Sequence, residues 1–109
     1  MVEEMPENDK ILKLIKQTVA LLAPHARLSL FGSRATGNYH EDSDYDILII
    51  IPQNEWNLSL KMEIENVLLD AGLSEGVFIN AFVESKENWE TDPGLYSLYL
   101  NAEKEGILL

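Results

Sequence analysis

The residues best suited to chemistry form one short stretch of the chain, in which a Gly-Ser pair precedes two aspartates. Gly32 and Ser33 open the segment Gly-Ser-Arg-Ala-Thr-Gly, and Asp44 and Asp46 follow after ten intervening residues. Because glycine lets the backbone approach a ligand closely, the amides of a turn here and the Ser33 hydroxyl suit phosphate oxygens. Arg34 would add a charged fork to such a nucleotide-binding turn.

The two aspartates suit a metal ion. Side chains alternate along a strand, so Asp44 and Asp46 are expected to share one face, about 6 to 7 Å apart along the strand. Carboxylates so placed repel each other unless they share a cation, and Mg²⁺ prefers hard oxygen ligands from carboxylates and phosphates. The pair therefore predicts a metal–nucleotide site, with Asp44 and Asp46 as metal ligands and catalytic residues.

Helix and strand patterns surround this stretch and would hold it in place. Apolar residues at helical spacing predict three amphipathic helices, and short apolar or β-branched runs predict three strands. The strands are expected over residues 28–31, 44–51 and 77–83, and the helices between Asn8 and Pro24, from Leu60 to a left-handed cap at Gly72, and from Asp92-Pro93 to before Gly106. This pattern predicts an α+β (mixed α/β) fold with a small mixed sheet packed against helices.

Size and composition limit the classes of function. A chain of 109 residues with 46% hydrophobic and 25% charged residues fits one globular domain, expected over residues 1–109. Eight basic against nineteen acidic residues give a net charge of −11, which opposes binding to nucleic acid or to anionic membrane surfaces. The same charge favours a basic protein partner or a site for divalent cations.

The sequence also predicts a location. The segment Met1 to Lys10 is acidic and polar, unlike a secretory leader, and the longest apolar stretch, Ile47 to Pro52, is far too short to span a bilayer. There is no cysteine, which excludes disulfides and thiolate metal sites and fits a reducing compartment. We therefore expect a cytoplasmic protein without a membrane span.

The combined spacing resembles the minimal members of the polymerase-β-type nucleotidyltransferase superfamily, which show Gly-Ser, ten residues and then Asp-x-Asp. Gly32, Ser33, Asp44 and Asp46 carry the resemblance, which covers the chain from the first helix through the third strand. It implies a polymerase-β-like nucleotidyltransferase fold that binds Mg²⁺ and ATP and transfers a nucleotidyl group to an acceptor. Members of this kind are commonly antitoxins of toxin–antitoxin pairs, in which AMP is attached to a tyrosine of a small helical ribonuclease toxin.

The chain departs from this family in the later strand, where active members usually place a third carboxylate that completes the metal site or acts as general base. Aligning on the segment Ser85 to Trp89 puts Phe78 there, with Asn80 and Glu84 further along the same strand face. Two hypotheses stay open: an AMP-transferring enzyme, and a catalytically weak or inactive antitoxin-like subunit that acts by complex formation. Transfer to small molecules such as aminoglycosides is disfavoured, because 109 residues leave little room for a substrate domain.

Other conspicuous side chains are interpreted as structural. His25 and His40 lack companions at metal-ligand spacing and are expected on the surface. Trp56 and Trp89 are expected to cover the edge of the core. Tyr96 and Tyr99 are expected to pack in the last helix.

Overall fold

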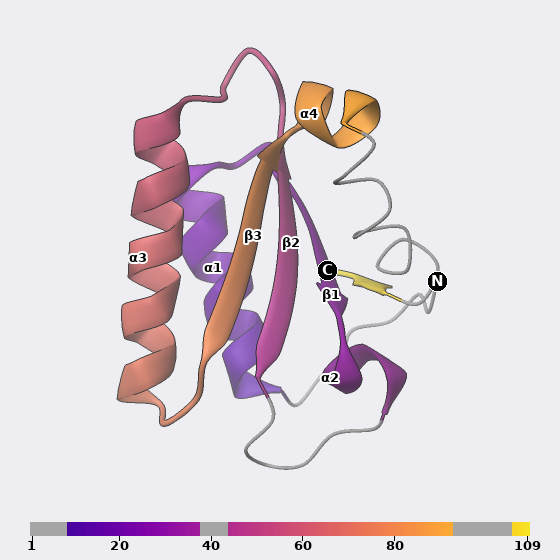
Figure 1. The fold of residues 1–109 in the computed structure, drawn as a ribbon. Helices are drawn as coiled ribbons and strands as arrows, with labels where there is room; N and C mark the ends of the chain where they lie inside the picture. Colours follow the sequence, from indigo (N-terminus) through magenta and orange to yellow (C-terminus); the bar gives the residue numbers. More distant parts are fainter. Residues whose placement is uncertain (1–8, 38–43, 93–105) are drawn as a thin grey trace.

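A four-stranded mixed sheet with two long helices against one face forms the fold (Figure 1), and the computed structural model describes residues 9–37, 44–92 and 106–109. The helices are α1 (Lys10–Leu22), α2 (Ser33–Thr36), α3 (Leu58–Ser74) and α4 (Lys86–Thr91), and the strands are β1 (Arg27–Phe31), β2 (Tyr45–Ile51), β3 (Ile79–Ser85) and β4 (Ile107–Leu108). The predicted α+β architecture with a small mixed sheet is confirmed.

The strand order in the sheet is β3-β2-β1-β4. Strands β2 and β3 are parallel, whereas β1 is antiparallel to both β2 and β4. Parallel neighbours need a crossover connection, and α3 supplies it between β2 and β3. Strand β2 is paired on both sides and buried on both faces, which explains its run of β-branched residues after Asp46.

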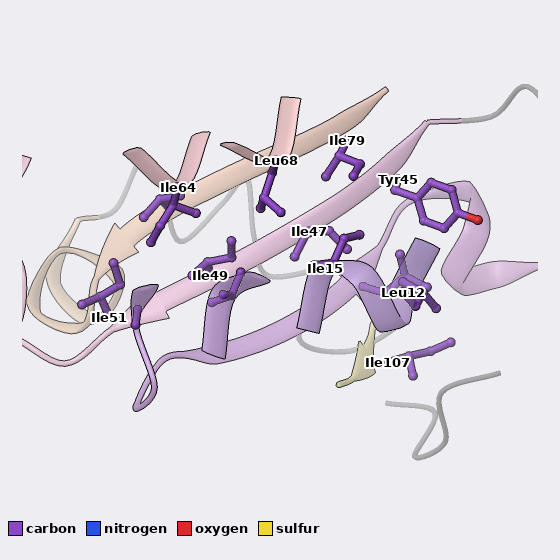
Figure 2. Close-up of a cluster of buried hydrophobic side chains, with 14 of the residues drawn as sticks. Leu12, Ile15, Tyr45, Ile47, Ile49, Ile51, Ile64, Leu68, Ile79 and Ile107 are labelled. Carbon is purple, nitrogen blue, oxygen red and sulfur yellow. The ribbon is translucent and has the colours of Figure 1, made fainter. Parts of the chain in front are cut away.

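The main core lies between the sheet and the two long helices (Figure 2). Side chains of α1 and α3 meet the inward-facing side chains of β2 and β3, as the alternation of a strand requires. Its fully buried members include Leu12, Ile15, Val19, Ile47, Ile49, Ile51, Ile64, Leu68 and Val83. This packing fixes which side chains of β2 point to the opposite face of the sheet.

A smaller apolar cluster occupies that opposite face. Leu48 and Ile50 of β2 are buried there and pack against Phe31, Phe82 and Trp89. The Phe31 and Phe82 ring centroids are 5.3 Å apart at an interplanar angle of 58°, a tilted arrangement that aromatic pairs favour. The cluster leaves the first part of β2 on this face to polar side chains.

Side-chain caps define where the long helices begin. The Asp9 carboxylate accepts a hydrogen bond from the backbone N–H of Leu12 at 3.0 Å, so α1 starts where the sequence predicts. Asn57 caps α3 in the same way, accepting from the Leu60 N–H at 2.8 Å. Because α3 begins before its first predicted apolar residue, its N-terminal turn is longer than expected.

The end of α3 corrects the expectation of a left-handed cap at Gly72. The helix continues to Ser74, and the glycine with positive φ is Gly76, at 78°. Val77 N donates to Gly72 O, and Gly76 N donates to Leu73 O, which is the Schellman pattern. Gly72 is buried inside the helix instead, where a Cβ would lie 2.8 Å from the Val77 carbonyl oxygen.

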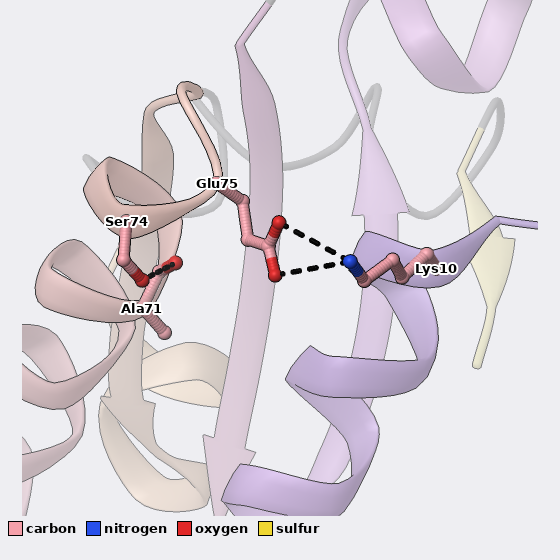
Figure 3. A network of polar contacts seen from close by, with 4 residues as sticks. All are labelled: Lys10, Ala71, Ser74 and Glu75. Carbon is pink, nitrogen blue, oxygen red and sulfur yellow. Dashed lines mark hydrogen bonds and ion pairs between the residues drawn. The ribbon is translucent and has the colours of Figure 1, made fainter.

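An ion pair joins the two long helices at one end (Figure 3). Lys10 Nζ in the first turn of α1 lies 3.3 Å from a carboxylate oxygen of Glu75, the residue that follows α3. The Lys10 side chain is 77% exposed, so water and salt screen most of this attraction. The pair marks where α1 and α3 meet and adds little stability.

Helix α2 forms within the predicted Gly-Ser turn, whereas two further elements, α4 and β4, are not predicted from the sequence. Several expectations lie outside the described residues. The short helix α4 is capped by the Ser85 hydroxyl, which accepts from Asn88 N at 3.0 Å, and β4 pairs with β1 over two residues. His40, Tyr96, Tyr99 and the helix expected after Asp92 lie outside the described residues. Within residues 9–37, 44–92 and 106–109, no helix has the length and apolar character needed to cross a membrane.

Three of the structural interpretations are confirmed. Trp56 packs against the main core, and Trp89 packs against the cluster on the opposite face. His25 lies on the surface, where its Nδ1 is 2.7 Å from a carboxylate oxygen of Glu55.

Candidate functional site

The two aspartates lie where β2 begins, on the sheet face opposite α1 and α3. Ile47 and Ile49 enter the main core, so strand alternation turns Asp46 to the other face. Asn80 lies directly across from Asp46 in β3, and its Nδ2 donates to Asp44 Oδ2 at 3.1 Å and to Asp46 Oδ1 at 3.0 Å. One amide nitrogen thus bridges both carboxylates, which confirms that the two aspartates face the same side.

The position beside the aspartates belongs to Asn80, which corrects the alignment that placed Phe78 there. Strand β3 begins at Ile79, two residues later than predicted, and Phe78 precedes it with 54% of its surface exposed. Glu84 lies four residues beyond Asn80, about 13 Å along the strand, and does not reach the pair. An amide therefore occupies the position expected for a third carboxylate.

Gly32 is the point of closest backbone approach to this site. It follows β1 directly and has φ 73° and ψ −158°, a conformation that is essentially restricted to glycine. A Cβ at Gly32 would collide with Asp46 Oδ2 and lie 3.3 Å from Asp46 Cγ. The Gly-Ser turn and the second aspartate therefore form one packed unit.

Arg34 is held by an aromatic ring on the other side of the strand. Its Cζ lies 3.9 Å from the ring centroid of Tyr45. Tyr45 stands between the two aspartates in the sequence, and its side chain is buried. The Tyr45 hydroxyl donates to both carboxylate oxygens of Asp9, at 3.1 and 2.9 Å, and Asp9 also caps α1. This chain of contacts ties α2, the start of β2 and the start of α1 together.

The predicted site residues are thus brought together only in part. Asp44, Asp46 and Gly32 meet, whereas Arg34 stacks on Tyr45, whose side chain alternates away from the aspartates. Ser33 is partly buried at the start of α2, and its role in binding phosphate stays a prediction, as does that of Arg34. The inward direction of the Tyr45 side chain could be predicted from the sequence, since the middle residue of Asp-x-Asp in a strand points to the face opposite the aspartates.

The family of the protein follows from comparison with known proteins. The nucleotidyltransferase domain family matches residues 9–95, which include every element from α1 to α4 and both aspartates. The chain belongs to the nucleotidyltransferase domain family. This establishes the superfamily that the Gly-Ser and Asp-x-Asp spacing indicates.

Two similar proteins extend this assignment of a nucleotidyltransferase domain. A protein of Methanocaldococcus jannaschii, named as a candidate protein adenylyltransferase, is 36% identical over 102 residues, which cover 89% of this chain and 95% of the relative. The crystal structure of a candidate nucleotidyltransferase from Sulfolobus solfataricus superposes with a TM-score of 0.58 and 24% identity, covering 91% of this chain and 76% of the other. The structural likeness supports the fold, and the sequence likeness supports a nucleotidyltransferase.

The oxygen donors of this nucleotidyltransferase domain suit a hard divalent cation. Asp44 is exposed and Asp46 half-buried, so both carboxylates are reachable from solvent, and an N–H donor already bridges them. Among the residues that the structure describes, no three Asp, Glu, His or Cys side chains lie close enough together to hold a metal. Asp44 and Asp46 would hold Mg²⁺ as a pair, with phosphate and water oxygens supplying further ligands.

Glu84, near the C-terminal end of β3, has a partly buried carboxyl group whose ionisation affects the stability of the fold. Burial raises the pKa of its carboxyl, against the attraction of Lys61 and a hydrogen bond with Asn88. Because folding raises this pKa, ionisation of Glu84 destabilises the folded state. This loss of folding stability is absent at low pH and appears as the pH rises above the pKa that Glu84 has in the unfolded chain. We expect Glu84→Gln to melt about 1–3 °C above the wild type at pH 7 and level with it near pH 4.

Circular dichroism melts at the two pH values measure this effect. Removing any carboxylate from an acidic chain relieves general repulsion, so Glu63→Gln on the exposed side of α3 is the matched control. An equal gain in both variants at pH 7 would assign the effect to overall charge and contradict a local cost at Glu84.

Proposed function

We propose that this protein binds Mg-ATP and transfers AMP to a hydroxyl, that of a tyrosine, on a partner protein. The single observation that carries the proposal is the convergence of Asp44 and Asp46 beside Gly32 at the start of β2. The name of the Methanocaldococcus relative supports AMP as the transferred group and a protein as the acceptor. The resemblance to minimal superfamily members supports a cytoplasmic antitoxin whose partner is a small helical ribonuclease toxin.

The residues have distinct tasks in such a transfer. The acceptor oxygen forms a bond to the α-phosphorus, the bond to pyrophosphate breaks, and the hydroxyl proton passes to a base. Asn80 cannot accept a proton, so among the described residues that meet at the site the two aspartates are the candidates for the base. Bound Mg²⁺ would neutralise charge on the phosphates. Gly32 keeps the turn close to Asp46, where phosphate oxygens would be held.

The proposal is tested by calorimetric titration of ATP into the protein with Mg²⁺ and again with EDTA. We expect binding that requires the metal, since two bare carboxylates repel a triphosphate. Intact-mass spectrometry of a small helical protein that forms a complex with this protein, incubated with it and Mg-ATP, should then show one added AMP. Absence of Mg-ATP binding would overturn the proposal.

Asn80 favours a second candidate function, that of a catalytically weak antitoxin-like subunit which acts by complex formation. Its amide takes the place where active members supply a third carboxylate, so metal affinity and proton transfer are both limited. In this alternative the stable complex with the partner forms without ATP and without any mass increase. The same spectrometry, combined with gel filtration of the mixture, separates the two functions.

Asn80→Asp is expected to raise both Mn²⁺ affinity and AMP transfer by about tenfold or more. The variant supplies a third oxygen ligand where an N–H donor now bridges the pair, and charge on ligands sets metal affinity. Mn²⁺ binding is measured by electron paramagnetic resonance and transfer by release of pyrophosphate. Asn80→Ala is the matched control, since it removes the amide without adding a carboxylate, and an equal gain in both variants would show that only removal of the amide matters.

A further inference from the structure

One flank of α3 carries an exposed apolar row that the fold does not use. Leu58, Met62, Leu69 and Leu73 are 63%, 52%, 41% and 51% exposed, and we call them the outer stripe of α3. They recur four, seven and four residues apart, so they lie along one side of the helix. Figure 1 shows α3 beside α1 in the layer of helices that covers the sheet.

The outer stripe is unusual for a helix that already covers a sheet. The buried residues of α3 are Ile64, Leu68 and Gly72, which face the main core. By the periodicity of the helix the side opposite them is polar, as in an ordinary surface helix, and the stripe occupies the flank between these two sides. Singly exposed leucines need no explanation, but several in a row on one helix mark a surface for association. Helix α3 therefore has a buried apolar side and an apolar flank that the fold leaves exposed.

The charges beside the outer stripe indicate what covers it. Glu65 lies three residues after Met62, and Asp70 lies three residues before Leu73, so one acidic residue borders the stripe on each side. Lys61 beside Glu65 is already paired with that carboxylate at 3.1 Å. A second copy of this chain would bring acidic edges together in a protein of net charge −11, so a basic partner is favoured.

We propose that the outer stripe of α3 is the docking site for a basic amphipathic helix of a partner protein. Leucines of the partner would cover the stripe, and its lysines or arginines would face Glu65 and Asp70. Apolar contact supplies the affinity and the acidic edges select the partner.

The stripe leads toward the candidate site. Leu73 lies in the last turn of α3, and Ile79 begins β3 just after the tight turn that ends this helix. The aspartates lie at this same end of the sheet, since Tyr45 pairs with Ile79 and Asp46 with Asn80. A partner docked along α3 thus extends to the end of the molecule that bears the site. That this partner is the AMP acceptor rests on the proposed function, whereas docking does not.

The test uses two synthetic helical peptides with leucines on one side, flanked by lysines in the first and by glutamates in the second. Fluorescence anisotropy at physiological salt should show the leucine–lysine peptide binding at least about tenfold more tightly than the leucine–glutamate peptide. The double variant Met62→Glu/Leu69→Glu should weaken binding of the leucine–lysine peptide at least about tenfold, because apolar contact is lost. This loss is expected even though the two added carboxylates attract the lysines of the peptide. Leu21→Glu/Lys13→Gln, which changes the net charge equally on α1 at two exposed positions, should leave binding unchanged.

Other outcomes of these experiments would overturn the docking site or its proposed occupant. Equal binding by both double variants would assign the attraction to overall charge and overturn the docking site. No binding of the leucine–lysine peptide would overturn the docking site outright. Sedimentation of the protein alone that shows a dimer lost in Met62→Glu/Leu69→Glu would assign the stripe to a second copy and overturn the basic partner. Mg-ATP titration of the same samples separates the two proposals, because docking that persists without nucleotide binding contradicts only the proposed transfer.

Discussion

Replacing Asp44 and Asp46 together by alanine is expected to weaken Mg-ATP binding by at least about a hundredfold while leaving the fold at least as stable. Both carboxylates would hold the metal in the proposed function, so their loss removes the ligands that make binding metal-dependent. The same two charges lie close enough to share one amide donor, Asn80, and their mutual repulsion opposes folding at neutral pH. Binding and stability should therefore change in opposite directions.

Calorimetry with Mg-ATP and a thermal melt of the same sample measure the two effects. Glu63→Ala/Asp70→Ala is the matched control, because it removes two carboxylates from exposed positions of α3, away from the start of β2. Both double variants should melt at or above the wild-type temperature, but only the first should lose the nucleotide. Retained binding in the Asp44→Ala/Asp46→Ala protein would place the nucleotide elsewhere and contradict the site.

Much of this fold could be predicted because its signals are local. The β-branched run after Asp46 fits a strand that is paired on both sides, and Pro52 ends it, so no tertiary knowledge was needed. The Asp-x-Asp alternation likewise follows from strand geometry alone, and one amide bridging Asp44 and Asp46 confirms it.

The predictions from sequence were wrong where tertiary contacts decide between two local structures that the sequence fits equally well. Gly72 and Gly76 both suit a helix end, and the choice depends on the Schellman hydrogen bonds and on Ile79 packing against the buried glycine. Strand β3 has the same alternation in either register, so only pairing with β2 decides that Asn80, and not Phe78, stands beside Asp46. Arg34 could not be placed because its ring partner, Tyr45, comes from a different element.

Short elements, and strands that pair with distant parts of the chain, could not be predicted from local sequence patterns. Strand β4 has two residues, and its pairing with Ser29 and Leu30 depends on the chain returning to β1. Helix α4 has only six residues, too few for a helical apolar period to show. Its Ser85 cap was the available signal, since serine before an acidic first turn is typical of a helix start.

Gly32→Ala should be the most destabilising single substitution at the site, at about 2–4 kcal/mol. The backbone there has φ 73° and ψ −158°, which costs an alanine about 1–3 kcal/mol by itself. The new Cβ would also collide with the Asp46 carboxylate, which cannot retreat without leaving Asn80. Because the collision displaces Asp46, which would hold the metal in the proposed function, the variant should lose Mg-ATP binding even when it is fully folded.

Gly37→Ala separates backbone strain from this collision. Gly37 also has a positive φ, 85°, but a Cβ there would meet no atom within 4 Å. Its left-handed conformation costs an alanine about 1–2 kcal/mol, partly offset by the lower entropy of the unfolded chain. Urea unfolding should therefore rank wild type above Gly37→Ala and Gly37→Ala above Gly32→Ala, with Mg-ATP binding lost only in the last. Equal losses in both variants would mean that the approach of Gly32 to Asp46 has no part in holding the site.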